Sequence, residues 1–403
     1  METDMFISKK VTEHTRNTSQ VEIVSYLSNL KKRSGEELID LSIGNPDLPP
    51  CDEALEILRE SISIKGIHGY GNLEGLPELK HQISEYYRTR YHVDIRPDEI
   101  VIVRGIRTMI FSLTSLFTGP GDIVLIPNVA YPSYFLATEF SGASQYLVPM
   151  NEDQGFIPDL DLVPEEILAQ AKMLFLNYPN NPTGAVIKKA QLEKIVKIAK
   201  QYSILIVYDN AYNEIVFDDE TPLSFMEIEG AKDVGIELFS LSKLTSLAGW
   251  RISFCTAGKE IISTIYEYLS LTETAPFNGF QFAAAKAIEM VSKHNLGHTI
   301  AMRYKDRYDS LSKVLEKIGL SYYPSKGSFY VWIRSPKGTG RDFADFLVEE
   351  AKLLVVPGEY YGPGGLEYVR ISLTMPDNLF DVFLKRLESM QFSWDQAQIT
   401  ENH

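Results

Sequence analysis

Residues 240–254 read SLSKLTSLAGWRISF. The single lysine of this stretch, Lys243, lies among hydroxyl side chains that include Ser240 and Ser242, and Arg251 follows it. A lysine that forms a Schiff base with an aldehyde cofactor needs such a setting, because small neighbours admit a ring while hydroxyl and guanidinium groups bind a phosphate. A lysine close to serines is also typical of a solvated surface loop. The other parts of the chain must therefore distinguish a cofactor site from a loop.

The composition limits the class of protein. A chain of 403 residues suits two domains, and its net charge of -15 argues against nucleic acid or an anionic membrane as the main partner, since both attract basic surfaces. Cys51 and Cys255 are the only cysteines and the histidines show no metal-ligand spacing, so we expect no disulfide framework and no metal site. No apolar leader and no apolar run long enough to cross a membrane occurs. We expect a cytoplasmic, enzyme-sized protein.

Strand and helix patterns alternate along the middle of the chain. Apolar runs predict strands at Ile100–Val103, Asp122–Ile126, Gln145–Val148, Met173–Asn177, Ile204–Tyr208 and Ile236–Phe239. Amphipathic patterns predict helices at Thr108–Phe117, Tyr134–Ser141, Lys189–Tyr202 and Glu260–Leu269. This alternation predicts an α/β fold in which a mainly parallel sheet is covered by helices on both faces.

The flanking segments predict a second, smaller α+β domain. Helices are expected at Gln20–Lys32, Asp52–Ser63, Leu79–Tyr91, Phe280–Ile318 with a break near 295–297, Arg341–Ala351 and Leu379–Met390. Strands are expected at Leu38–Ile43, Leu320–Tyr323, Ser328–Ile333, Leu353–Val356 and Tyr368–Leu373. We therefore predict an N-terminal arm at 1–19, a large domain at 51–290 and a small domain made of 20–50 and 291–395.

The ends of the predicted parallel strands carry polar residues. Ligands of such sheets bind beyond the carboxyl ends of the strands. The segments that follow those ends are Gly105–Arg107, Asn128–Tyr131, Tyr178–Gly184, Asp209 and Ser240–Lys243. We expect these five segments to meet at one site.

The predicted ring-binding residues follow three of these strands. Asp209 could hold a pyridinium nitrogen protonated, since a shielded ion pair keeps that proton, although a carboxylate at a sheet edge could also serve as a structural cap. Tyr212 and Asn181 could donate hydrogen bonds to an oxygen on the ring. Tyr131 could stack on the face of the ring or simply pack in the core.

The predicted phosphate-binding residues are Ser240, Arg251 and the backbone after Gly105. A helix is expected to begin close to Gly105, and the partial positive charge of a helix N-terminus favours an anion. These residues and those that bind the ring would together form the site of a phosphorylated aldehyde cofactor.

Several motifs are similar to those of a known family. They are the NPTG tetrad at Asn181–Gly184, the pair Asp209-x-x-Tyr212, Ser240-x-Ser242-Lys243 with Gly249-Trp250-Arg251, and Val369-Arg370-Ile371-Ser372. In this order and spacing the chain resembles, over about residues 36–390, the pyridoxal-phosphate-dependent aminotransferases of fold type I, class I/II. The resemblance implies a large domain with a mainly parallel sheet, a smaller α+β domain and pyridoxal 5'-phosphate as the cofactor.

The resemblance also assigns roles to individual residues. Lys243 is similar to the Schiff-base lysine that also moves the proton of the substrate α-carbon, and Asp209 to the partner of the pyridine nitrogen. Arg370 is similar to the arginine that binds the substrate α-carboxylate, aided by Asn181 and the backbone at Gly44. The alternative for Arg370 is a surface salt bridge.

Tyr70 matches a tyrosine that reaches the cofactor phosphate of a neighbouring subunit, although it could also pack in the core. The resemblance therefore implies a homodimer with shared active sites.

The sequence departs from the family pattern at three places. Ile106 replaces the usual small residue after Gly105, with Arg107 next, so the phosphate site could use a side-chain charge where other members use a hydroxyl. Leu244 follows the lysine, and Asn128-Val129-Ala130 precedes Tyr131 where Pro-Gly is frequent. The departures leave every catalytic group in place, but they do not determine which residues form the substrate pocket.

The implied reaction is a ping-pong transamination between an L-amino acid and a 2-oxo acid. Burial and the nearby charge of Arg251 should lower the pKa of Lys243 enough for it to act as a base. A lyase, decarboxylase or oxidase on the same fold remains an alternative. A non-catalytic regulator is disfavoured, because Lys243, Asp209, Tyr212 and Arg370 are all present and no DNA-reading domain is recognised. No predicted strand is followed by GxGxxG, which excludes a Rossmann dehydrogenase.

The substrate class rests on a finer similarity. HGYG at 68–71 and FLNYPNNPTGAV at 175–186 are similar to the corresponding segments of phenylalanine aminotransferases of the bacilysin pathway. This favours an aromatic or other neutral amino acid. We expect Ile43, Tyr131, Phe329 and Tyr361 to line an apolar pocket.

Overall fold

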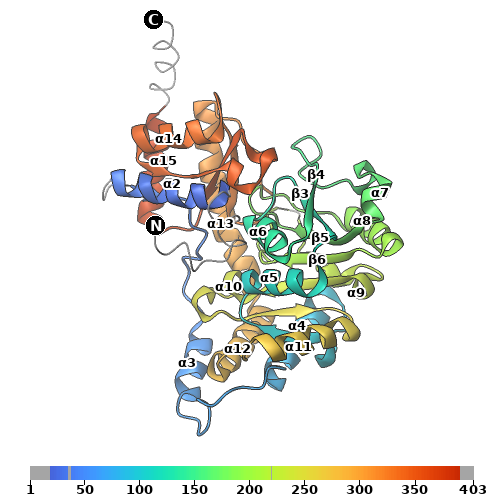
Figure 1. Cartoon of the computed structure of the whole chain (residues 1–403). Coiled ribbons are helices and arrows are strands. Elements are labelled where there is room, and N and C mark those ends of the chain that lie inside the picture. The colour runs from blue at the N-terminus through green and yellow to red at the C-terminus, as the bar shows by residue number, and fades with distance from the viewer. Residues whose placement is uncertain (1–18, 35–37, 219, 391–403) are drawn as a thin grey trace, which may run out of the picture.

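The computed structural model describes residues 19–34, 38–218 and 220–390 (Figure 1). The N-terminal arm predicted at 1–19 lies outside these ranges except for Ser19, which begins helix α2 (Ser19–Ser34). None of the helices in the described ranges is both long enough and apolar enough to span a bilayer.

A seven-stranded sheet forms the centre of the larger part of the molecule. Its strands are, in spatial order, β2 (Ile100–Val103), β8 (Ser253–Thr256), β7 (Gly235–Ser240), β6 (Leu205–Asn210), β5 (Ala171–Asn177), β3 (Ile123–Pro127) and β4 (Ser144–Val148). The pairs from β4 to β7 are parallel, whereas β8 is antiparallel to both β7 and β2. The expected mainly parallel α/β sheet is confirmed.

Strand β8 was not predicted from the sequence. Its four residues include the polar Ser253 and Thr256, so the apolar pattern is too short to indicate a strand. Both polar residues are nevertheless fully buried, because β8 lies between two other strands of the sheet. Tertiary burial therefore creates a strand where local preference is weak.

Alternation along the strands gives each face of the sheet its own apolar cluster. Val101, Val124 and Val207 pack with one set of helices, whereas Ile102, Leu125 and Ile206 pack with the other set. The first set is α5 (Ile106–Phe117), α6 (Pro132–Ser141) and α11 (Lys259–Thr272). The second set is α4 (Pro77–Tyr91), α8 (Lys189–Tyr202) and α12 (Asn278–His294), with α3 (Asp52–Ser61) packed against α12 (Figure 1).

Short elements complete this part of the molecule. They are α7 (Glu165–Leu168), α9 (Ala231–Val234), α10 (Leu241–Leu244) and the 3₁₀ helices at Pro97–Glu99, Leu160–Leu162, Phe225–Glu227 and Ala248–Trp250. The short helix α10 carries Lys243 and follows β7 directly.

A smaller antiparallel sheet has the strand order β11 (Val356–Pro357), β12 (Tyr368–Ser372) and β9 (Tyr330–Arg334). Beside it, β1 (Ile39–Asp40) pairs in parallel with β10 (Leu353–Leu354). These strands pack with α13 (Leu296–Ile318), α14 (Gly340–Ala351) and α15 (Asp377–Ser389) around a separate apolar cluster. Figure 1 shows α2, in blue, beside α14 and α15, in red, so the N-terminal helix joins C-terminal elements.

Two predicted elements of this region need correction. Leu320–Tyr323 is not a strand, since only Tyr322 forms an isolated bridge, with Ile333, and the following Pro324 cannot donate to a ladder. The predicted strand Leu353–Val356 is divided, because its first half pairs with β1 and its second half with β12. The expected helix break is confirmed at Asn295, which has a positive φ of 49° between α12 and α13.

Candidate active site

The carboxyl ends of the parallel strands open into a cavity of about 580 Å³. All five predicted segments contribute to its wall, because parallel strands bring their carboxyl ends to one edge of the sheet. Residues from the smaller sheet and from the segment after β1 close the opposite side. The predicted site residues in the wall are Gly44, Ile106, Arg107, Tyr131, Asn181, Asp209, Tyr212, Ser240, Ser242, Lys243, Arg251 and Arg370.

Lys243 projects its amine toward the segment after β1. Its Nζ donates a hydrogen bond of 2.6 Å to the carbonyl oxygen of Gly44. Burial lowers the pKa of this amine to about 8, and the positive charges of Arg370 and Arg251 act in the same direction. Near pH 7 to 7.5 roughly a tenth to a quarter of the amine is therefore neutral, far more than for an ordinary lysine, and can act as a nucleophile or base.

Asp209 lies near the end of the buried strand β6 and is only 4% exposed. Tyr134 donates a hydrogen bond of 2.8 Å to Oδ2, whereas Oδ1 is buried without a partner. Burial raises the pKa of this carboxyl to about 6. An unpartnered buried carboxylate oxygen in a cavity wall is suited to accept a hydrogen bond from a bound ligand.

The backbone of Asp209 is held by a residue that the sequence analysis did not single out. The side-chain amide of Asn177 donates 2.7 Å to the Asp209 carbonyl, and its oxygen accepts 2.8 Å from the Asn181 backbone. Asn177 ends a predicted strand, and Tyr134 lies three residues after Tyr131, so both were close to recognised segments. Only the structure reveals that their side chains point toward Asp209.

Tyr212 follows β6 and reaches the cavity beside a second tyrosine. Its hydroxyl lies 3.3 Å from the hydroxyl of Tyr330, and its ring meets Phe329 edge to face at 5.3 Å between centroids. Phe329 itself is fully buried and does not line the cavity, although its ring centroid lies 5.5 Å from Nζ of Lys243. The prediction that Phe329 lines the pocket is wrong, because β9 directs Tyr330 rather than Phe329 into it.

Arg370 lies on β12 and is only 6% exposed, which excludes the alternative of a surface salt bridge. Its Nη1 donates 3.0 Å to Oδ1 of Asn181, and its Nη2 donates to the carbonyl of Ser42. The Nε atom is buried without a partner. A buried guanidinium with a free N–H in a cavity is suited to bind a carboxylate.

The third region of the wall contains Gly105 and Arg251. Gly105 precedes α5 with a φ of 103°, and a Cβ atom there would lie 2.3 Å from Nη2 of Arg251. Glycine is required both by this positive φ and by the close approach of the guanidinium. Helix α5 begins at Ile106, so its first backbone N–H groups and Arg251 face the same part of the cavity.

Two further predicted residues complete this region. The Ser240 side chain accepts a hydrogen bond of 3.1 Å from the backbone of Ser242, and both residues line the cavity. Together with the start of α5 they form a site suited to an anion.

Tyr70 is a predicted cofactor residue that does not line this cavity. Its side chain is 96% exposed, so it does not pack in the core, and it is not part of the cavity in this chain.

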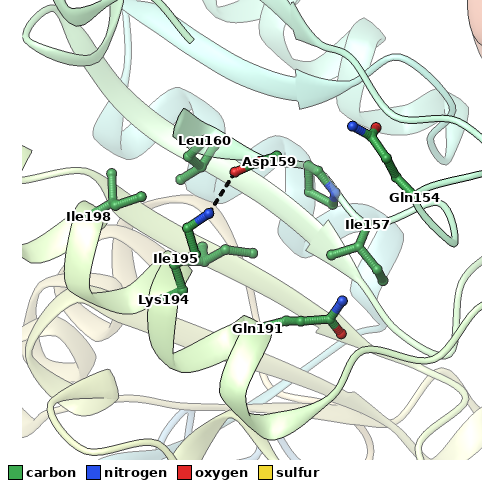
Figure 2. Close-up of a pocket in the computed structure, with 9 residues that line it drawn as sticks. Gln154, Ile157, Asp159, Leu160, Gln191, Lys194, Ile195 and Ile198 are labelled. Carbon is green, nitrogen blue, oxygen red and sulfur yellow. Dashed lines mark hydrogen bonds and ion pairs between the residues drawn. The ribbon is translucent and has the colours of Figure 1, made fainter. Parts of the chain in front are cut away.

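A second pocket, of about 200 Å³, lacks comparable chemistry. Figure 2 shows it between α8 and the segment around residue 159, with Lys194 paired to Asp159 at 2.9 Å. Its charged groups are already paired and largely exposed. The strand-end cavity is therefore the candidate active site.

Comparison with known proteins agrees with this geometry. Residues 36–387 match the family model described as aminotransferase class I and II. The chain belongs to this family. Its members use pyridoxal phosphate and transfer amino groups between amino acids and 2-oxo acids, so the protein is an aminotransferase of fold type I.

Individual relatives match over nearly the whole chain. Transaminase BacF of Bacillus subtilis is 36% identical, covering 92% of this chain and 93% of the relative. LL-diaminopimelate aminotransferase of Syntrophobacter fumaroxidans is 33% identical, covering 89% and 92%. A solved structure of substrate-bound BacF superposes with a TM-score of 0.88 at 35% identity, covering 96% of this chain and 98% of that chain.

The residues of the cavity fit the cofactor of this family. The unpartnered Oδ1 of Asp209 can accept a hydrogen bond from a protonated ring nitrogen, and the amine of Lys243 can react with an aldehyde carbon. The glycine cradle at Gly105, with Arg251 across it, suits a phosphate.

Proposed function

We propose that this chain is a pyridoxal-phosphate-dependent aminotransferase for L-amino acids with aromatic or other neutral side chains, working by a ping-pong cycle. The observation that carries the proposal is that three groups line one cavity. They are Lys243, whose amine has a lowered pKa, Asp209, which has an unpartnered buried carboxylate oxygen, and Arg370, whose buried Nε has no partner. These three groups would bind the cofactor aldehyde, the cofactor ring nitrogen and the substrate carboxylate, respectively.

Each group has a distinct task. The bound cofactor supplies an electron sink that makes the substrate α-proton acidic. Nζ of Lys243 would take that proton from the substrate α-carbon as a base and donate it, as an acid, to the carbon through which the cofactor binds the amine. Oδ1 of Asp209 would keep the ring nitrogen protonated, and Tyr212 and Asn181 would bind the ring oxygen. Ser240, Arg251 and the first N–H groups of α5 would hold the phosphate.

Arg370 orients the substrate by binding its α-carboxylate through Nε and an Nη atom. The rings of Tyr131, Tyr360 and Tyr361 and the side chain of Ile43 also line the cavity, which supports an aromatic or aliphatic side chain. A donor with a second carboxylate would need another cation there, and Arg107, which also lines the cavity, is expected to bind the phosphate instead.

A single-turnover experiment tests this proposal. The cofactor-loaded protein is mixed with phenylalanine, tyrosine, LL-diaminopimelate, aspartate or glutamate, one at a time and without any 2-oxo acid. We expect close to one equivalent of 2-oxo acid per site from phenylalanine or tyrosine, and none with Lys243→Ala. Release of carbon dioxide or peroxide would refute transamination, and preference for aspartate or glutamate would refute the neutral substrate class.

We also propose that the active unit is a homodimer in which Tyr70 of one subunit reaches the phosphate site of the other. Tyr70 and Leu271 are 96% and 87% exposed, and Ile62 and Ile64 are about half exposed. Leu271 shares a hollow with Arg251, which also lines the active-site cavity. Leu271 therefore adjoins the phosphate region, which supports a second copy as the occupant of this part of the surface.

Mixing two inactive variants tests this arrangement. Lys243→Ala lacks the essential amine, and Tyr70→Ala lacks the proposed phosphate contact. In a mixed dimer one site would regain both groups, so we expect activity to return after the two variants are unfolded and refolded together. A monomeric protein, or a mixture that stays inactive, would contradict the shared site.

The domain division at 51–290 against 20–50 with 291–395 is likewise proposed. Its support is that the small sheet has an apolar cluster of its own with α13, α14 and α15, although Trp332, Val356 and Tyr368 of that sheet pack with a cluster of the large sheet. Some residues after β6, such as Tyr212 and Phe217, pack with the cluster of the small sheet, so the two parts share a boundary beside the active site.

A further inference from the structure

Tyr330 contacts three parts of the candidate active site although no sequence motif points to it. It is the first residue of β9, it is buried, and it lines the cavity. Its ring lies 4.0 Å from the guanidinium carbon of Arg370, and its hydroxyl lies 3.3 Å from that of Tyr212. A Cβ atom on Gly44 would lie 1.9 Å from the Tyr330 hydroxyl oxygen.

We propose that Tyr330 is a positioning residue with two separable tasks: its ring orients Arg370 for the substrate carboxylate, and its hydroxyl orients the phenol of Tyr212 toward the cofactor ring. The inference rests on the proposed function, because the roles of Arg370 and Tyr212 are taken from it.

The register of the small sheet brings the ring beneath the guanidinium. Arg370 pairs with Trp332 across β12 and β9, and Tyr330 is two residues before Trp332. Tyr330 and Arg370 are therefore diagonal neighbours on one face of an antiparallel pair, where long side chains reach each other. The backbone of Tyr330 is also fixed, since Ser325 Oγ donates 2.9 Å to its carbonyl.

The guanidinium is constrained in every direction except one. Tyr330 covers it at 4.0 Å and Tyr361 lies 5.2 Å from it, while its two Nη atoms bond to Asn181 and Ser42. Only Nε has no partner. Aromatic rings attract a guanidinium and leave its in-plane N–H groups free. The ring of Tyr330 thus holds the plane of Arg370 while a carboxylate approaches its edge.

The hydroxyl of Tyr330 orients Tyr212 because each of the two phenols has only one proton to donate. Each phenol has one proton, so if Tyr212 donates its proton to the cofactor ring oxygen, Tyr330 must donate to the oxygen of Tyr212. Gly44 leaves room for this hydroxyl, because any side chain there would collide with it. The same Gly44 bonds to Lys243 through its carbonyl. Without the hydroxyl of Tyr330, the phenol of Tyr212 loses this donor, so the pH at which the bound cofactor titrates should change.

Two variants separate the tasks. Tyr330→Phe keeps the ring and removes the hydroxyl, whereas Tyr330→Leu removes both. Tyr361→Phe is the matched control, since it deletes a hydroxyl from the other ring near the same guanidinium, whereas the hydroxyl that contacts Tyr212 is that of Tyr330. For each loaded protein, the pH midpoint of the cofactor absorption band is measured by titration. The dissociation constant of 3-phenylpropanoate, a carboxylate without an amine, is measured by calorimetry.

We expect Tyr330→Phe to move the pH midpoint by about 0.5 unit or more, the size of a lost hydrogen bond, and to bind 3-phenylpropanoate within about twofold of wild type. Tyr330→Leu should show the same shift and weaken 3-phenylpropanoate by about tenfold, the size of a desolvated cation–π contact. Tyr361→Phe should leave the midpoint unchanged.

An unshifted midpoint in a Tyr330→Phe protein that binds the cofactor normally would overturn the role of the hydroxyl. Equal carboxylate affinity in the Phe and Leu variants would overturn the role of the ring. A wild-type protein that binds no pyridoxal phosphate would instead overturn the proposed function, and this inference with it.

Discussion

The buried carboxyl of Asp209 should make the cofactor-free protein less stable as the pH rises. Its pKa is raised from 3.8 to about 6 by burial. Below both values the group is neutral in the folded and unfolded chains and has no effect. Between them the unfolded chain ionises while the folded chain does not, so the free energy of unfolding falls with rising pH until about pH 6 and then stays level.

The shift also gives the size of the effect. About two pKa units correspond to about 3 kcal/mol in total, of which about 2 kcal/mol falls between pH 4.5 and 7.5. Asp209→Asn removes the titration but keeps an acceptor for the hydroxyl of Tyr134. Its new amide group meets no partner where Oδ1 lay, but this cost does not change with pH.

Urea unfolding of the cofactor-free proteins, followed by tryptophan fluorescence at pH 4.5 and 7.5, measures this difference. Wild type should lose about 2 kcal/mol more than Asp209→Asn over that interval. Asp153→Asn, at an exposed carboxylate, should behave as wild type. Identical pH dependence in wild type and Asp209→Asn would refute the reasoning. Added pyridoxal phosphate should stabilise wild type far more than Asp209→Asn, because the carboxylate then gains a cationic partner.

Three further outcomes follow from the cavity. Lys243 in the cofactor-free protein should react with an amine-directed reagent with a midpoint near pH 8, and Arg370→Met should raise that midpoint because a nearby positive charge is lost, as a pH series of labelling rates would reveal. Arg370→Lys should raise the KM of the amino donor by about tenfold or more, since the fork of N–H groups is lost, and an unchanged KM would contradict carboxylate binding. Gly105→Ala should weaken pyridoxal phosphate binding by at least about tenfold in a fluorescence titration, because the new methyl group displaces Arg251, whereas Gly119→Ala, in open space, should not.

The fold class and most of the cavity wall could be predicted from the amino-acid sequence alone. Alternating strand and helix patterns impose a mainly parallel sheet, and such a sheet brings the segments after its strands to one edge. Lys243, Asp209 and Asn181 could be predicted to meet because each follows such a strand. Local chemistry also indicated that the amine of Lys243 would have a lowered pKa.

The side chains that support these groups could not be predicted in this way, because they depend on tertiary packing. Strand β8 exists because burial between β2 and β7 outweighs its weak local pattern. Phe329 and Tyr330 are adjacent in sequence, and the orientation of β9 alone determines that Tyr330 enters the cavity. Tyr134, Asn177 and Tyr330 act across distances in sequence that no local pattern encodes, because hydrogen bonds and ring contacts depend on how separate elements pack.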